Sequence, residues 1–213
     1  MRKILMLLLL TGATPLPITA QTNYDHKVIA VLPCRTKFTE YKNISDSNMQ
    51  AFRTLEVKYG IQLQEALYNT ITADTNRLLV EVQPWQTTDS ILRNAGLDLR
   101  KVPFLDISAI AKRLKVDACI VTTATYGGGN VGNMRGSTSM AGLIADAAAS
   151  QLNKAIYRNN KIFTFRLIDG KSGDEVWNYS QEMTVGDITL VKDQLVFSKR
   201  IFKRFRKQFP YCD

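Results

Sequence analysis

A compact aliphatic run, Lys-Val-Ile-Ala-Val-Leu-Pro, occupies residues 27–33 and ends in a proline. Short uninterrupted apolar runs are typical of strands that are covered on both faces of a sheet. A second β-rich run occupies residues 117–126. We therefore predict a buried strand in each place, which restricts the chain to folds in which helices cover a sheet.

The segment between these two runs alternates between helical and extended patterns. Residues 47–74 have helical spacing, and their apolar stripe consists of Phe52, Leu55, Tyr59, Leu63, Leu67 and Ile71. Gly60 lies inside this pattern and is expected to bend or divide the helix, because glycine destabilises a helix interior. The next extended pattern predicts a strand at residues 78–82.

Two short helices are predicted before the second run. The first is expected to end at Gly96, and its candidate capping residues are Thr87, Thr88 and Asp89. The second is expected to begin near Asp106 or Ser108 and to end at Leu114. The resulting order of strand, helix, strand, helix and strand is typical of an α/β layered domain.

The last third of the chain contains a predicted hairpin and a predicted helix. Extended patterns at residues 161–168 and 175–184 flank the turn sequence 169–174, and Trp177 and Tyr179 should share one sheet face as packing residues. A helix is expected from Asp187 to Gln208, with Val191, Leu195, Phe202, Phe205 and Phe209 as its apolar stripe. The predicted fold class is therefore α/β, an α+β layered sandwich. A central mixed sheet of about five strands carries packed helices and is followed by a C-terminal β-hairpin and a basic amphipathic helix.

Residues 127–160 form an insertion between the predicted strand and the hairpin. Glycine, asparagine and serine surround Arg135 in the first part, which predicts a long loop. An alanine-rich helix is predicted from Met140 to Ile156, and its small side chains would allow close approach of another backbone. Arg135, Met140 and Leu143 are therefore candidate interaction residues.

Residues 1–20 have the order of a secretory signal peptide. Arg2 and Lys3 precede a short apolar run, and small residues lead to a cleavage site before Gln21. No cysteine lies near this site, so a lipid anchor at the new amino terminus is not expected. We expect a periplasmic protein, at the periphery of the outer membrane or released from it, with a single domain over residues 21–213 and no transmembrane segment in the mature chain.

The basic residues of the chain are concentrated near its C-terminus. The formal net charge is +9, and the last predicted helix contributes Lys199, Arg200, Lys203, Arg204 and Lys207 as candidate interaction residues. An exported protein rarely meets nucleic acid, so the expected partner is another envelope protein or an anionic envelope surface. A solvated helix face whose cations only keep the chain in solution is the alternative interpretation.

The sequence predicts no catalytic, cofactor-binding or metal-binding residue. His26, the only histidine, is expected to lie in a flexible terminus beside the cleavage site. The glycines at 127–132 follow a strand but lack the lysine and hydroxyl ending of a phosphate-binding loop. Cys119 is expected to be a buried small hydrophobe, and a Cys34–Cys212 disulfide is one alternative for the other two cysteines.

Several segments resemble the CsgG-like and TolB amino-terminal-like group of cell-envelope proteins. The motifs are the opening strand 28–33, the long helix before residues 78–82, the helix that reaches Asp117 before a strand, and the hairpin 165–177. The resemblance implies an anticodon-binding-domain-like topology used for assembly or interaction. The chain lacks the lipobox cysteine and the membrane hairpins of the channel members, so channel activity is not implied. The small-residue helix is also similar to one in a family of outer-membrane assembly lipoproteins.

Three hypotheses about function follow. The first is a non-enzymatic periplasmic module that binds another envelope protein or an anionic envelope surface. The second is self-assembly into an oligomeric component of an envelope secretion or assembly complex, through the small-residue helix. The third, from a different class, is a ligand-binding protein or hydrolase whose residues converge only in space.

Overall fold

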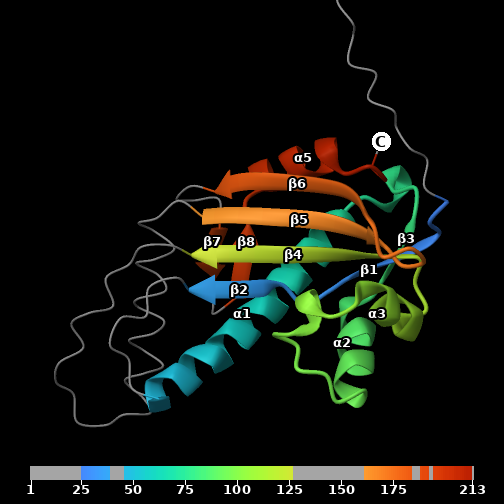
Figure 1. Cartoon of the computed structure of the whole chain (residues 1–213). Coiled ribbons are helices and arrows are strands. Elements are labelled where there is room, and N and C mark those ends of the chain that lie inside the picture. The colour runs from blue at the N-terminus through green and yellow to red at the C-terminus, as the bar shows by residue number, and fades with distance from the viewer. Residues whose placement is uncertain (1–24, 39–45, 127–160, 184–187, 192–193, 213) are drawn as a thin grey trace, which may run out of the picture.

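The computed structural model describes residues 25–38, 46–126, 161–183, 188–191 and 194–212. Its centre is a six-stranded mixed sheet, seen across its width in Figure 1, in which β2 pairs with β4 beside the main order β3-β1-β4-β5-β6. The strands are β1 (Val28–Val31), β2 (Arg35–Phe38), β3 (Glu81–Gln83), β4 (Ala118–Tyr126), β5 (Lys161–Asp169) and β6 (Glu175–Met183). The predicted α/β class with a central mixed sheet is confirmed.

The strands of the sheet divide into a parallel part and an antiparallel part. β1 runs parallel to β3 and to β4, and β2 runs parallel to the second half of β4. β4, β5 and β6 are antiparallel neighbours, and the predicted hairpin joins the last two. β6 therefore forms one margin of the sheet and β3 forms the other.

Two helices cover one face of the sheet, α1 (Asp46–Ile71) and α5 (Lys199–Gln208). α1 packs Tyr59, Leu63, Leu67 and Ile71 into a core that also contains apolar residues of β1, β4 and β5. α5 lies beyond α1, towards the β6 side, and adds Ile201, Phe205 and Phe209 to the same core. The predicted stripe of the long helix is thereby confirmed at its four buried positions.

The opposite face of the sheet carries α2 (Trp85–Asn94) and α3 (Ile107–Leu114). Leu92 of α2 and Ile110, Ala111 and Leu114 of α3 pack against Ala30, Leu32, Cys119 and Val121 of the sheet. Since alternate residues of β1 and β4 enter the two cores, both strands are buried on both faces, as their aliphatic runs predicted. Two 3-10 helices, η1 (Thr75–Arg77) and η2 (Val102–Phe104), lie in the connections.

Gly60 does not divide the long helix, because α1 is continuous from Asp46 to Ile71. A Cβ atom at this position would lie 2.3 Å from the carbonyl oxygen of Cys34. The Cys34 amide also donates a hydrogen bond of 3.1 Å to the Gly60 carbonyl. Glycine is required here because the helix touches the backbone between β1 and β2. The strand β2 was not predicted, because Arg35–Phe38 has the composition of a polar segment.

The predicted helix from Asp187 also requires correction. Its first part forms the strands β7 (Ile188–Val191) and β8 (Gln194–Phe197), which pair with each other, and only α5 is helical. β-branched residues favour strands over helices, and Ile188, Thr189, Val191 and Val196 supply them here. Val191 and Leu195 therefore do not belong to the stripe of α5.

Smaller expectations were tested at helix ends and at the cysteines. α2 begins at Trp85, before its candidate caps, with Thr88 and Asp89 already inside the helix. α3 begins as predicted, since the Asp106 carboxylate accepts from the amides of Ser108 and Ala109. All three cysteines remain thiols rather than forming the Cys34–Cys212 bridge, and Cys119 is fully buried as expected. Among the described residues, no helix has the length and apolar character needed to cross a membrane.

Candidate functional site

The apolar side of α5 fixes this helix firmly to the sheet. The ring of Phe205 lies 5.0 Å from that of Phe165 in β5 and 6.0 Å from that of Trp177 in β6, both edge to face. The ring centroid of Phe209 lies 5.6 Å from that of Trp177 and 5.1 Å from that of Phe205. Aromatic pairs at such distances contribute about 0.5–1.5 kcal/mol each beyond the burial of their area. Trp177 and Tyr179 share this face, so the prediction that they pack together is confirmed.

The outer side of α5 is a basic surface. We define the basic face of α5 as its five exposed cationic residues: Lys199, Arg200, Lys203, Arg204 and Lys207. Within the described part of the chain, no acid forms an ion pair with the three lysines or with Arg204. The predicted residues of this helix are thus brought together on one solvent-facing surface.

Arg206 is the exception among the cations of α5. Its side chain is only 23% exposed, and its Nη2 atom lies 3.0 Å from the backbone oxygen of Asp74 and 3.6 Å from the Asp74 carboxylate. Asp74 lies just after α1, so this contact joins the C-terminal helix to the end of the long helix. Arg206 therefore has a structural role, the connection of α5 to the end of α1.

The cations in the first turn of α5 oppose the stability of an isolated helix, whereas Arg206 and Lys207 in its last turn complement the helix dipole. Lys199 and Arg200 occupy its first turn, where no acidic residue is present. Cations at a helix N-terminus face the positive end of the helix dipole, an interaction of about 0.3–1 kcal/mol per charge. Lysines at 199, 203 and 207 also repeat at intervals of four, and like charges at that spacing repel by about 0.2–0.5 kcal/mol per pair. Helix stability thus does not account for this distribution of charge.

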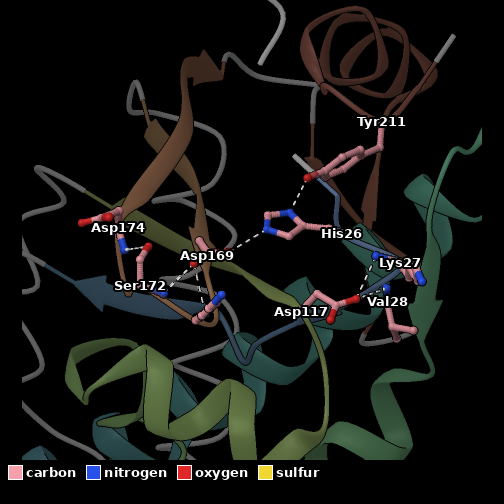
Figure 2. A network of polar contacts seen from close by, with 9 residues as sticks. His26, Lys27, Val28, Asp117, Asp169, Ser172, Asp174 and Tyr211 are labelled. Carbon is pink, nitrogen blue, oxygen red and sulfur yellow. Dashed lines mark hydrogen bonds and ion pairs between the residues drawn. The ribbon is translucent and has the colours of Figure 1, made fainter. Parts of the chain in front are cut away.

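A polar network joins three segments that are distant in the sequence, and Figure 2 shows Asp169 and Tyr211 on two sides of the His26 ring. The Nε2 atom of His26 lies 2.8 Å from a carboxylate oxygen of Asp169 at the end of β5. Its Nδ1 atom is hydrogen-bonded to the hydroxyl group of Tyr211, beyond α5. Asp117, at the start of β4, accepts from the backbone amides of Lys27 and Val28 at 2.8 and 2.9 Å.

The two carboxylates of this network are held in their ionised form. Burial opposes ionisation of Asp169, but the backbone amide of Ser172 and the side chain of His26 donate hydrogen bonds that lower its pKa to about 2. The pKa of Asp117 is lowered chiefly by the hydrogen bond from the Val28 amide. Since the Asp169 carboxylate accepts, Nε2 of His26 carries a proton, and in the neutral imidazole Nδ1 accepts from the Tyr211 hydroxyl.

This network corrects the expectation that His26 belongs to a flexible terminus. The His26 side chain is 6% exposed, and both ring nitrogens are engaged within the chain. Each ring nitrogen faces a partner from a distant segment, so the imidazole links three parts of the fold. We interpret the network as a tie between the amino terminus, the hairpin turn and the C-terminal segment. Sequence reasoning missed it because His26 lies 143 positions from Asp169 and 185 from Tyr211.

The remaining predicted interaction residues cannot be placed beside α5. Arg135, Met140 and Leu143 lie in residues 127–160, outside the described part of the chain, as do the proposed signal peptide and its cleavage site. They remain predictions.

Comparison with known proteins gives a likeness of fold and no sequence relative. No protein-family model matches the chain. No curated protein matches it either. Among solved structures, it is similar to the lipoprotein GNA1162 from Neisseria meningitidis, with a TM-score of 0.43 and 11% identity over 74% of this chain and 79% of that one. LpoB from E. coli gives a TM-score of 0.43 and 12% identity over 74% and 56% of the two chains.

A third similar structure is the C-terminal domain of LpoB from Salmonella enterica. It gives a TM-score of 0.36 and 11% identity over 74% of this chain and 82% of that one. At such identities the likeness concerns the course of the chain only. The resemblance to CsgG-like and TolB proteins stays a prediction.

Proposed function

We propose that this protein is a non-enzymatic interaction module of the cell envelope, which binds an acidic partner protein through the basic face of α5. The observation that carries the proposal is the pair of cations in the first turn of this helix, which oppose its dipole. The charges at 199, 203 and 207 repel one another as well. A charge pattern that costs stability is expected where a surface serves recognition.

The buried side of α5 supports the same role. Ile201, Phe205 and Phe209 hold the helix against the sheet, and Arg206 fixes its orientation relative to Asp74. A partner would therefore meet cations on a rigid support, with little loss of backbone freedom on binding. Opposite charges across such an interface chiefly accelerate association and select the partner.

The proposal can be tested by reversing charge on two helices of the same protein. The test variant replaces Lys199, Lys203 and Arg204 with glutamate. The matched control replaces Lys112, Arg113 and Lys115, at the end of α3, with glutamate and changes the net charge equally. Both variants and the parent chain are crosslinked in intact cells, and the captured proteins are identified.

We expect the α5 variant to lose its captured partner while the α3 control retains it. Capture that is unchanged in the α5 variant would reject the proposal. Sedimentation with anionic lipid vesicles tests the alternative partner, an anionic lipid surface. Binding to vesicles that depends on α5, without a captured protein, would assign the basic face to a lipid surface instead.

A further inference from the structure

The margin of the sheet next to α5 is an unusually open strand edge. β6 has nine residues, and within the described part of the chain its only strand partner is β5. In an antiparallel ladder, alternate residues of a margin strand direct their N–H and C=O groups away from the sheet. Residues 175–183 contain neither proline nor lysine, and the two charged residues, Glu175 and Glu182, lie near the ends of the strand, with the Glu175 carboxylate 3.8 Å from the Arg166 guanidinium. The edge is therefore able to accept a further strand.

The orientation of α5 brings part of its basic face to this edge. Arg206 points towards Asp74 and so marks the side of the helix nearest to α1. At about 100° per residue, Arg204 and Arg200 project from the opposite side of the helix. α1 contacts β1 and β2, whereas Phe205 packs on Phe165 of β5 and Trp177 of β6. The side away from α1 is thus the side of the β6 edge, along which α5 runs in Figure 1.

A buried donor on β6 also lacks an acceptor. Gln181 is 5% exposed and lies on the same face as Tyr179, whose hydroxyl donates to the Gln181 side-chain oxygen at 3.3 Å. Its side-chain nitrogen has no hydrogen-bond partner among the described residues. A buried donor without a partner costs about 1–3 kcal/mol, so an acceptor brought to this edge would remove a penalty.

We infer that an extended, acidic segment of the partner protein adds to β6 as a further strand, with its carboxylates directed at Arg200 and Arg204. This inference rests on the proposed function and specifies the partner segment. A second copy of this chain is a poorer occupant, because pairing of two β6 edges would bring two basic helices together. Main-chain hydrogen bonds would supply affinity, and the arginines would select acidic side chains.

The experiment uses a fluorescein-labelled ten-residue peptide in which threonine and glutamate alternate, with anisotropy measured on the full-length secreted protein at low salt. Two further peptides carry N-methyl groups on the threonines or on the glutamates, which removes alternate N–H donors. A fourth peptide has glutamine in place of glutamate. The protein variants are R200Q/R204Q and, as the matched control, K112Q/R113Q.

Strand addition predicts that one N-methylated peptide binds roughly tenfold or more weakly while the other binds like the parent peptide, because only one set of amides faces β6. The glutamine peptide and the R200Q/R204Q variant should also bind more weakly, and the α3 control should not. Equal binding of both methylated peptides, or no binding of the parent peptide, would overturn the inference. Monomeric behaviour in light scattering is expected, whereas a dimer disrupted by the peptide would assign the edge to a second copy.

Failure of this inference and failure of the proposed function give different results. If the charge-reversed α5 variant loses its captured partner but N-methylation has no effect, the basic face binds and the edge does not. If capture survives charge reversal, the proposed function fails whatever the peptides do.

Discussion

Helices α3 and α5 are both short, amphipathic and cationic, yet they place their charges differently. Asp106 is the N-cap of α3 and accepts from the amides of Ser108 and Ala109, and Lys112 and Arg113 lie in the last turn of this helix. Both ends therefore complement the helix dipole. α5 begins with Lys199 and Arg200 and has no acidic residue in its first turn. The cations of α3 are explained by the stability of the helix, whereas those at the start of α5 oppose it.

This difference shows that the position of a charge is more informative than the number of charges. Both helices are fixed by apolar residues, α3 through Ile110 and Leu114 and α5 through Phe205 and Phe209. Packing thus leaves the outer side of each helix free to vary in charge. Only on α5 does the observed choice reduce helix stability, and for that reason the proposed interaction is assigned to it.

The largest expected loss of stability comes from truncating a buried side chain of α5 or of α3. Phe205→Ala should lower the free energy of unfolding by about 3–5 kcal/mol, and Leu114→Ala by about 2–5 kcal/mol, because each leaves a cavity in a core. Equilibrium unfolding in urea measures both. A loss below about 1 kcal/mol at Phe205 would show that α5 is not an integral part of the core.

A smaller effect is expected where α3 meets the hairpin turn. A Cβ atom at Gly170 would lie 2.7 Å from Cβ of Ala111 and 2.7 Å from the backbone oxygen of Asp117. Gly170→Ala should therefore cost about 1–3 kcal/mol through overpacking. Asn94→Ala at an exposed position is the control and should stay within about 0.5 kcal/mol. Equal stability of the two variants would show that the turn can move away from α3.

The stability that Asp169 contributes through its contact with His26 should be lost in acid. The pKa of Asp169 falls from 3.8 when unfolded to about 2 when folded, so its contribution to stability is complete above pH 3.8 and is lost as the pH falls towards 2. Asp169→Asn should be less stable than the parent at pH 5, and the difference should shrink between pH 3.8 and 2. Thermal unfolding followed by circular dichroism measures this, and a difference independent of pH would contradict the tie through His26.

The smallest expected effect is the sharpest test of the comparison. Lys199→Glu should raise the free energy of unfolding by about 0.3–1 kcal/mol, whereas Lys112→Glu should lower it by a similar amount, because the two residues lie at opposite ends of their helix dipoles. Calorimetry at low salt resolves the signs. Changes of the same sign would remove the physical reason for separating α5 from α3.

The sequence was sufficient where a local pattern determines the structure. The buried strands, the stripe of α1, the start of α3 at Asp106 and the hairpin at 169–174 all follow from residues close together in the chain. Prediction from the sequence failed where contacts between distant segments determine the structure. Gly60 is explained only by the backbone of Cys34, and the environment of His26 only by Asp169 and Tyr211.

The candidate site was predicted in composition but not in arrangement. The five residues of the basic face are apparent from the sequence, and helical spacing brings them together. The contact of Arg206 with Asp74, which separates this arginine from its neighbours, depends on how α1 and α5 are placed. The position of β6 at the margin of the described sheet likewise depends on strand order, which no local pattern specifies.

The close approach of α1 to the backbone at Cys34 makes this sulfur a reporter of helix docking. Cys34 is 4% exposed, and burial raises its pKa, so little reactive thiolate is present while Gly60 lies against it. An alkylating reagent should reach the sulfur only after the long helix separates from the sheet. The time course of alkylation at Cys34, followed separately from that of the half-exposed Cys212, would then measure how often that separation occurs.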